Sequence, residues 1–348
     1  MNEVNVSNGA VQKLKAIQKE AVERLQVQRR TALDILNTTE EQNRIIIDPI
    51  MERGHVSVFY GESDAGKSQF LQQLVLSLVE GDRKFLNWEY RAEYRRAIYV
   101  ATEDIEQDVR RVLKRMANPS VSKYLKNLEY IFEDEATESI EKLIKRLEES
   151  ISVQAVDLIV IDAMMDVFEG SMNDAGQIRK QFMKPLKRLA KESKTHIMVL
   201  THVAKGRQRN GASKDNILGS QAIEASARLV MEYKRDPDPG RDHIRHLCIV
   251  KSNYLPPDYK SLSYELERDP HTFRVKATGN RVDTDQLAKQ SKTADPEMES
   301  KIISRKKSGI SNANIAAELG IGESTVQRRV KELIRQGKLN ANNKPPKK

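Results

Sequence analysis

Apolar residues alternate between two kinds of pattern along the middle of the chain. Short apolar runs, each typical of a buried strand, occur at residues 55–60, 97–101, 158–161, 197–201, 229–233 and 246–250. Longer segments, in which apolar residues recur as on one face of a helix, lie at residues 69–79, 106–116, 140–151 and 175–193. This alternation predicts an α/β domain with a mainly parallel sheet over residues 45–278.

Residues 1–44 carry a further helical pattern among many charged residues. The spacing predicts a helix from Ala10 to Leu36, whose apolar face would consist of Val11, Leu14, Ile17, Ala21 and Leu25. No segment of similar character follows directly. The face must therefore pack either on the body of the protein or on another subunit, and we expect residues 1–44 to form an N-terminal helical arm.

The pattern changes again after the α/β segment. Residues 279–298 are polar and nearly free of large apolar side chains, which predicts a linker. Two helical segments follow within residues 299–348, where Ser311 is placed to cap the first helix and Gly320 to end it. This arrangement predicts a small all-α helix-turn-helix or winged-helix domain, with residues 337–339 where a wing would start.

The second of these helices has one apolar and one polar face. Val326, Val330 and Leu333 recur at helical spacing and would be buried. The side chains able to reach phosphates or base edges in a major groove are Thr325, Gln327, Arg328, Arg329 and Lys331. The pattern predicts contact with duplex DNA, and a small helical protein-binding module is the alternative.

Charge is distributed unevenly along the chain. The 348 residues have a net charge of +9, and residues 301–348 alone hold 12 Lys/Arg against 3 Asp/Glu. Residues 1–300 therefore sum to zero. A neutral body with a basic C-terminal segment favours contact with nucleic acid through the C-terminus.

Composition excludes several classes of protein. The single cysteine, Cys248, allows neither a disulfide nor a Cys-based zinc site. No stretch approaches the ~20 apolar residues of a membrane span, and the polar N-terminus does not have the pattern of a signal peptide. We therefore expect a cytoplasmic protein that has no membrane partner.

The octapeptide from Gly61 to Ser68 matches the phosphate-binding pattern G-x-x-x-x-G-K-[ST] and lies between a predicted strand and a predicted helix. Such a loop turns its amides around a triphosphate, and the helix N-terminus adds positive charge. Lys67 can reach the β- and γ-phosphates, and the Ser68 hydroxyl can bind Mg²⁺. We expect ATP and Mg²⁺ at Gly61, Glu62, Ser63, Asp64, Ala65, Gly66, Lys67, Ser68 and Gln69.

Further polar residues end neighbouring predicted strands. Asp162 ends an apolar run and can support the Mg²⁺ shell through water. Glu103 is favoured as the base that accepts a proton from the attacking water, although Asp104 could exchange roles with it or both could be turn residues. His202 could contact the γ-phosphate or be purely structural. These residues are expected at the ligand-binding edge of the sheet.

This set of residues, in this order, resembles the RecA-like ATPase core and, more narrowly, the plasmid RepA and DnaB-type hexameric replicative helicases. The resemblance covers about residues 45–260. It rests on the residues Gly61–Ser68, Ala101–Asp104, Leu158–Asp162, Thr201–Lys205 and Leu218–Gln221.

The resemblance implies a homo-oligomeric ring, such as a hexamer, with ATP sites between subunits and Glu103 as the catalytic base. It also implies that residues 206–216 face single-stranded DNA. We therefore expect contacts from the cations in and beside this loop, which are Lys205, Arg207 and Arg209.

The chain departs from the family pattern after its late strand. There the family commonly has a Lys and an Arg two residues apart, which a neighbouring subunit offers to the γ-phosphate. Lys251 matches the Lys, whereas Asn253 takes the place of the Arg. Either turnover is slow or another cation substitutes, for which the candidates are Arg228, Lys234 and Arg235.

Two functions of different classes follow. The first is an ATP-binding, ATP-hydrolysing, DNA-associated protein of a plasmid, phage or mobile element, either a replicative helicase or a DNA-stimulated ATPase. The second is a sequence-specific DNA-binding regulator or replication initiator that uses ATP as a switch. A RecA/RadA-type recombination mediator is a third reading, for which no filament-forming segment is evident.

Overall fold

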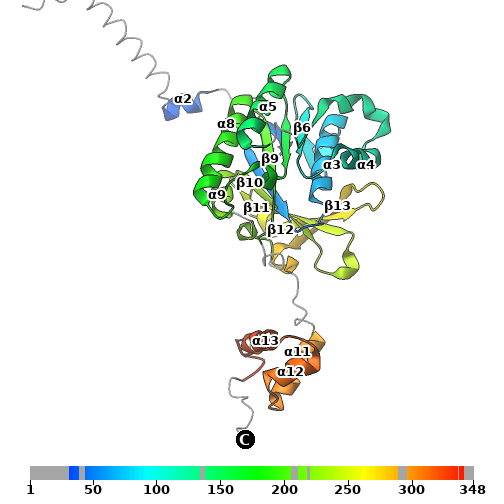
Figure 1. Cartoon of the computed structure of the whole chain (residues 1–348), viewed down its shortest axis with the longest axis vertical. Helices are drawn as coiled ribbons and strands as arrows, with labels where there is room; N and C mark the ends of the chain where they lie inside the picture. The colour runs from blue at the N-terminus through cyan, green and yellow to red at the C-terminus, as the bar shows by residue number, and fades with distance from the viewer. Residues whose placement is uncertain are drawn as a thin grey trace, which may run out of the picture. The chain divides into compact units, whose positions relative to one another are not determined.

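The computed structural model describes residues 31–38, 44–133, 138–204, 211–217, 220–288, 296–335 and 337–340. The chain divides into two units, residues 1–44 and residues 45–348. An α/β core and a small helical unit at the C-terminal end follow one another within the second of these (Figure 1). Each is described by itself.

The core is built on a nine-stranded sheet with the strand order β13-β12-β11-β10-β3-β9-β8-β6-β7. Its parallel part consists of β3 (Val56–Gly61), β6 (Ala97–Ala101), β7 (Leu128–Phe132), β8 (Leu158–Asp162), β9 (His196–His202) and β10 (Leu229–Arg235). Its antiparallel part consists of β11 (Ile244–Ser252), β12 (Leu262–Arg268) and β13 (Val275–Asp283). All six apolar runs predicted as strands lie in this sheet.

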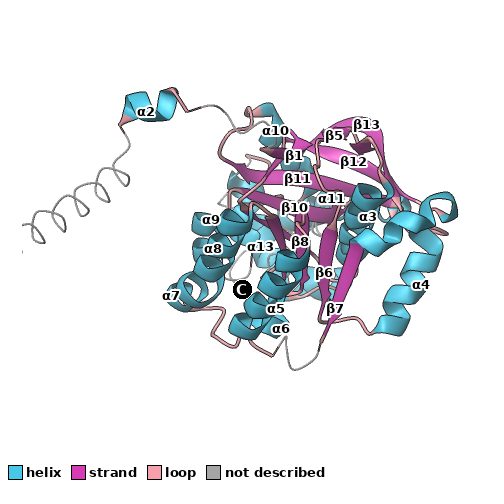
Figure 2. Ribbon diagram, turned by 90° about the horizontal axis from the view of Figure 1, so that it is seen from above, coloured by secondary structure: helices cyan, strands magenta, loops and turns pink. Residues whose placement is uncertain are grey.

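Helices cover both faces of the sheet (Figure 2). On one side lie α3 (Lys67–Glu80) and α4 (Glu106–Met116), and on the other lie α5 (Ile140–Val153), α8 (Lys184–Ser193) and α9 (Ser220–Ser226). The buried residues form two large apolar clusters, one with side chains from α3 and the other with side chains from α5, α8 and α9. This is the layered arrangement that alternating strands and helices predict.

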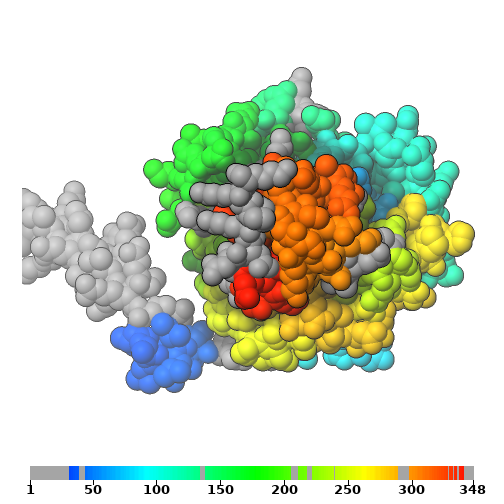
Figure 3. Space-filling model, turned by 90° about the horizontal axis from the view of Figure 1, so that it is seen from below, coloured from blue at the N-terminus to red at the C-terminus, as the bar shows by residue number. Residues whose placement is uncertain are grey.

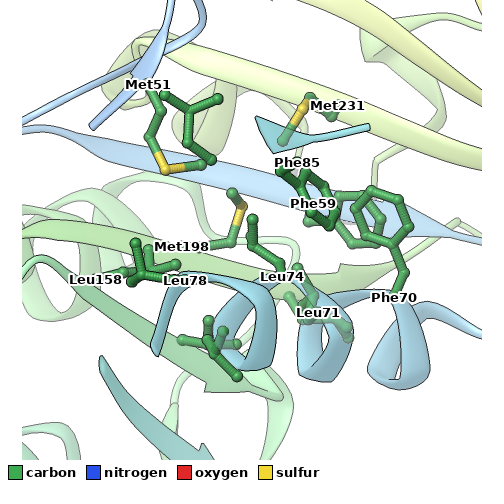
Figure 4. Close-up of a cluster of buried hydrophobic side chains, with 14 of the residues drawn as sticks. Met51, Phe59, Phe70, Leu71, Leu74, Leu78, Phe85, Leu158, Met198 and Met231 are labelled. Atoms are coloured by element: carbon green, nitrogen blue, oxygen red, sulfur yellow. The ribbon is translucent and has the colours of Figure 1, made fainter. Parts of the chain in front are cut away.

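Aromatic packing fixes the start of α3 against the central strands. Phe70 stacks on Phe59 of β3 with ring centroids 5.0 Å apart, and its centroid also lies 5.0 Å from that of Tyr233 in β10. Leu71 and Leu74 of the same helix face the sheet beside Met198 (Figure 4). Because α3 begins at the phosphate-binding pattern, this packing holds that loop at the ends of β3 and β10.

A second, smaller sheet was not predicted from the sequence. It has the strand order β2-β1-β5-β4. Its strands are β1 (Ile45–Asp48), β2 (Met51–Glu52), β4 (Lys84–Phe85) and β5 (Trp88–Tyr90). Runs of two to four residues are too short to give a recognisable alternation.

The predicted helix at residues 175–193 is irregular. It consists of α7 (Ala175–Gln177), a π-helical stretch at Ile178–Met183 and α8. One regular helix over residues 175–193 would need an amide hydrogen at position 185, which Pro185 lacks. Pro185 lies instead in the first turn of α8, where that donor is not required. The other short helices are α6 (Met164–Val167), α10 (Asp258–Ser261), and the 3-10 turns η1 (Pro119–Asn127), η3 (Lys214–Asn216), η4 (Pro239–Arg241) and η5 (Thr284–Leu287).

The linker prediction was wrong for residues 279–288. Strand β13 continues to Asp283, and η5 follows directly. Most of these strand residues are exposed, because β13 is the last strand of the sheet, and an edge strand tolerates the polar composition that suggested a linker. Residues 289–295 lie outside the described ranges.

The C-terminal unit contains α11 (Pro296–Lys307), α12 (Asn312–Leu319) and α13 (Glu323–Arg335) around a small apolar core. The N-terminal unit is described only around α2 (Ala32–Leu36). Thr31 has an extended backbone and caps α2, so the final part of the predicted helix from Ala10 to Leu36 begins at Ala32, and its earlier residues lie outside the described ranges. None of the helices in the described ranges is long and apolar enough to cross a membrane.

Candidate active site

The phosphate-binding pattern forms a turn between β3 and α3. Gly66 caps the helix with φ of +91°, a conformation that favours glycine. A Cβ on Gly61 would lie 2.2 Å from the Tyr233 carbonyl oxygen, so only glycine fits beside β10. The two fixed glycines of the pattern are therefore explained by backbone geometry.

Two arginines that sequence reasoning did not assign to this role hold the loop from outside. Arg235, at the end of β10, donates to the Asp64 carbonyl at 2.5 Å, and Arg245 of β11 donates to the Ala65 carbonyl at 2.8 Å. Arg235 therefore serves its own loop, which argues against it as the cation offered to a neighbouring subunit. A strand-borne arginine gives no local signal of such a contact.

Lys67 lies within the loop. Its side chain is buried, and its Nζ donates to the Glu62 carbonyl oxygen at 2.8 Å. Burial lowers the pKa of Lys67, while the nearby carboxylates of Asp162 and Glu103 act in the opposite direction. A phosphate would be a stronger acceptor for this ammonium than the carbonyl oxygen.

Asp162 ends β8 inside the site. Tyr99 donates from its hydroxyl to Asp162 Oδ2 at 2.5 Å, whereas the buried Oδ1 has no hydrogen-bond partner among the residues that the structure describes. Burial raises the pKa of Asp162 to about 6, against the opposing effect of the Tyr99 and Ser68 hydroxyl groups. The Ser68 hydroxyl and the unpartnered oxygen of Asp162 fit a magnesium ion and its waters.

Glu103 and His202 meet across β8. Glu103 follows β6 and His202 ends β9, the two strands on either side of β8, and His202 Nε2 lies 3.3 Å from Glu103 Oε1. The hydrogen bond to His202 holds the pKa of Glu103 below its usual range, whereas burial raises the pKa of Asp104. The pKa values of the two adjacent carboxyl groups are thus shifted in opposite directions.

Lys251 lies toward the other end of the strands. In the register of the sheet, Lys251 is opposite Val230, which is opposite Val58, three residues before Gly61. At about 3.3 Å per residue, this places Lys251 roughly 10 Å back along the strands and two strands away from the loop. The site of its own chain is therefore not the one that it can reach.

The candidates for the missing arginine differ in position. Lys234 is buried and pairs with Glu232 at 3.3 Å, so it cannot serve as a mobile cation. Arg228 is exposed and precedes the start of β10. The pKa of Lys251 is lowered mainly by burial, and the positive charge of Arg228 contributes to the lowering. Of the three candidates, only Arg228 is both exposed and near Lys251.

A cluster of arginine and phenylalanine side chains beside the phosphate-binding loop was also not predicted from the sequence. Arg268 donates to Gln69 Oε1 at 2.9 Å, directly after the phosphate-binding pattern. The guanidinium of Arg268 lies 5.0 Å from the Phe273 ring centroid, and that of Arg115 lies 4.6 Å from the same centroid. The contact with Gln69 places this cation–π cluster next to the phosphate-binding pattern.

The C-terminal unit has the predicted helix-turn-helix geometry. Ser311 accepts a hydrogen bond from the Asn314 amide and caps α12, and Gly320 ends that helix with φ of +63°. Val326 and Leu333 are fully buried on α13. Figure 3 displays the surface of the unit in orange and red.

The predicted DNA contacts on α13 divide into three groups. Gln327 and Lys331 are exposed and Thr325 is half-buried, so these side chains remain available. Arg329 is buried and forms an ion pair with Glu299 of α11, so we no longer count it as a DNA contact. The Arg328 side chain, like Lys205, Arg207 and Arg209, lies outside the described residues.

Comparisons with known proteins agree with this architecture. The sequence matches the AAA domain family over residues 21–208, which is more than half of the chain, and a winged helix-turn-helix DNA-binding family over residues 302–339. A solved ATPase domain of another protein is similar in fold, with a TM-score of 0.51 and 13% identity over 65% of this chain and 85% of that chain. A search of curated proteins finds no match. The predicted fold class, a RecA-like α/β core followed by a helix-turn-helix domain, is confirmed.

Proposed function

The chain belongs to the AAA domain family, and on this premise we propose that it binds ATP with Mg²⁺ at residues 61–69 and hydrolyses it in association with DNA. One observation carries the proposal. Lys67, Glu103 and Asp162, which come from three separate segments, interact electrostatically at one edge of the sheet. Phosphate binding, proton acceptance and metal support are thus combined in one place.

Each residue has a distinct part in the proposed reaction. Lys67 would exchange the Glu62 carbonyl for a phosphate oxygen, and Ser68 and Asp162 would hold Mg²⁺ directly and through water. When bound, Mg²⁺ would neutralise part of the negative charge of the phosphates. Glu103, whose pKa the hydrogen bond to His202 holds below its usual range, would orient the attacking water and accept its proton.

We propose the cluster of Arg268 and Phe273 as the place of the nucleobase. Its contact with Gln69 puts it next to the phosphate-binding pattern, and guanidinium and phenyl planes stack on purines without reading their edges strongly. We therefore expect little discrimination between ATP and GTP. Exchange of Phe273 for Ala should weaken nucleotide binding, as measured with a fluorescent analogue.

The active form in this proposal is a homo-oligomer whose ATP sites are completed by a neighbour. Lys251 and Arg228 cannot reach the site of their own chain, and both are cations. A head-to-tail ring would bring them to the γ-phosphate bound by the next subunit. There Arg228 would supply the positive charge that Asn253 cannot.

We also propose the division of the chain. Residues 1–44 would form an arm, the ATPase core would extend from residue 45 to η5, and the DNA-binding domain would begin at α11. Single-stranded DNA would contact Lys205, Arg207 and Arg209 of the core. Duplex DNA would contact the half-buried Thr325 and the exposed Gln327 and Lys331, together with Arg328.

The proposal is tested by phosphate release from purified protein, with and without single-stranded DNA. We expect DNA-stimulated hydrolysis that is lost in Lys67→Ala. Equal phosphate release from the wild type and this variant would remove the ATPase. Strand separation of a forked duplex then decides whether the ATPase is a helicase of the RepA and DnaB type.

A second function is favoured by Asn253 and by the exposed polar face of α13. In this alternative the protein is an ATP-switched, sequence-specific regulator or replication initiator. Footprinting separates the two, because a short repeated duplex site supports the regulator and sequence-independent single-strand binding supports the motor.

A further inference from the structure

Glu232 is a carboxylate in the middle of β10 with almost no exposure. Its Oε2 lies 2.8 Å from the Tyr60 hydroxyl and accepts from the Ser213 amide at 3.1 Å, while its Oε1 accepts from Lys234 at 3.3 Å. The Asn216 side-chain amide lies 3.4 Å from both carboxylate oxygens. Burial raises the pKa of Glu232, and Lys234 and Tyr60 act against that effect.

Most of these contacts concern one segment, residues 211–217. The Ser213 carbonyl accepts from the Tyr60 hydroxyl at 2.7 Å, and the Asn216 side chain donates to the Gly211 carbonyl at 2.9 Å. The same segment is closed against the end of β9, because the Ala204 amide donates to the Asn216 carbonyl at 2.8 Å. Val203 and Ile217 form a β-bridge beside it. Both flanks of residues 205–210 are thus tied together.

The other end of the network lies at the nucleotide site. Tyr60 is the residue before Gly61, so the side chain that holds Ser213 belongs to the strand that leads into the phosphate loop. Glu232 is opposite Tyr60 in the parallel register of β10 and β3. Through hydrogen bonds alone, the network joins the strand that enters the phosphate loop to the segment that follows residues 205–210.

Such a network is costly for a purely structural element. A buried carboxylate is unfavourable unless all its neighbours satisfy it, and apolar side chains of equal volume stabilise a core as well or better. Hydrogen bonds are directional, however, so a small movement of one partner changes the whole set. That sensitivity suits communication better than stability.

We propose that Glu232, Tyr60 and Asn216 are positioning residues that couple nucleotide binding to the segment 211–217. The inference rests on the proposed function, because that function places the contacts with single-stranded DNA directly before this segment. It goes beyond that function by naming the residues through which the two sites communicate. None of the three is placed in the catalytic or nucleotide-binding machinery.

The first experiment measures ATP hydrolysis in Tyr60→Phe, Glu232→Gln and Asn216→Ala. Tyr60→Phe removes one hydroxyl and keeps the packing, so it stays informative if the other variants fold poorly. We expect hydrolysis without DNA to stay within about twofold of the wild type. The stimulation by single-stranded DNA should fall roughly two- to thirtyfold, the range of a coupling residue.

Tyr130→Phe is the matched control. The Tyr130 hydroxyl also lies in the interior but has no hydrogen-bond partner within the described part of the chain, so its removal should leave the stimulation unchanged. Equal loss of stimulation in Tyr60→Phe and Tyr130→Phe would contradict a specific network.

The second experiment does not depend on catalysis. Trypsin can cut after Lys205, Arg207 and Arg209, and we expect a non-hydrolysable ATP analogue to change the cleavage rate at these sites in the wild type. In the network variants the analogue should bind with unchanged affinity, by fluorescence titration, and leave the cleavage rate unaltered.

The two proposals fail in distinguishable ways. A wild-type protein that binds no nucleotide overturns the proposed function and this inference with it. A wild type that binds and hydrolyses ATP without altered cleavage overturns only the coupling. The coupling is also overturned if the three variants retain both the wild-type stimulation and the wild-type cleavage response.

Discussion

A buried carboxylate with one unpartnered oxygen is the most informative single group in the described part of the core. Asp162 receives one strong hydrogen bond from Tyr99 and is otherwise shielded from water, so its charge is poorly compensated in the metal-free protein. Its pKa of about 6, against an ordinary value of 3.8, expresses this lack of compensation. Ionisation of Asp162 therefore lowers the stability of the folded protein.

We expect Asp162→Asn to stabilise the metal-free protein at pH 8 but not at pH 4. The stability contributed by protonated Asp162 is fully present below about pH 4 and is lost as the pH rises through 6, a loss of roughly 3 kcal/mol at most. The neutral amide avoids this loss. Urea unfolding of the wild type and the variant, in the presence of a chelator at both pH values, measures the difference in their free energies of unfolding.

Asp258→Asn is the control, because Asp258 is exposed. Its free energy of unfolding should change little at either pH. Destabilisation by Asp162→Asn at pH 8 would contradict the expectation. The same variant should lose magnesium-dependent nucleotide binding, which separates its effect on the fold from its effect on the site.

Glu103→Gln should reduce the rate of ATP hydrolysis about 10²–10⁴-fold and leave nucleotide affinity nearly unchanged, because the amide cannot accept a proton. Asp104→Asn should have a much smaller effect, and the reverse order would exchange their roles. In His202→Ala the pKa of Glu103 should rise, because its principal cause of lowering is removed. The acid limb of the pH–rate profile should therefore move to higher pH.

Individual residues were predictable where a local pattern demands them. The positions of Gly61, Gly66 and Lys67 follow from a contiguous motif, and Asp162 and Glu103 from the ends of apolar runs. Partners supplied by distant strands were not predictable, so the roles of Arg235 and Arg329 were misjudged. A basic side chain carries no mark in the sequence that separates a ligand contact from an internal ion pair.

Secondary-structure elements were predicted best where they are long or wholly apolar. Strands β3, β6, β8, β9, β10 and β11 follow directly from their apolar runs. Strands β7, β12 and β13 and the small sheet were missed, because partly exposed or very short strands carry little periodicity. The helix start after Thr31 was missed because a threonine is also tolerated within helices.

The recognition helix α13 gives a prediction at this scale. Lys331 is exposed on α13, so Lys331→Ala should weaken duplex DNA binding and reduce the salt dependence by about one counterion. Lys126→Ala, which removes the same charge from an exposed position of the core, is the control. Equal weakening of binding in both variants, measured by fluorescence anisotropy, would assign the effect to net charge alone.

At the scale of the whole molecule, the register of the sheet separates the two halves of the proposed site. The loop at Gly61 and the cations Lys251 and Arg228 lie toward opposite ends of the same strands. A single chain therefore offers one half of a site at each end. Assembly would be required for hydrolysis, and dilution below the dissociation constant of the assembly should abolish it.

Mixing two inactive variants tests this arrangement. Lys67→Ala lacks the phosphate-binding ammonium and Lys251→Ala lacks the cation for the neighbour, so each alone should be inactive. In a random equimolar mixture about a quarter of the interfaces combine both intact halves, and about a quarter of the wild-type rate should return. No recovery after mixing of dissociated subunits would contradict shared sites.

The contact between Lys67 and the Glu62 carbonyl has a consequence for the proposed function beside DNA. A polynucleotide presents many anionic groups at high local density, and an unshielded ammonium would attract them indiscriminately. Lys67 already donates a hydrogen bond within its own loop, so a single phosphodiester would have to replace that bond and would gain little binding free energy. A triphosphate engages several amides at once, so it can displace the carbonyl where a strand of DNA cannot.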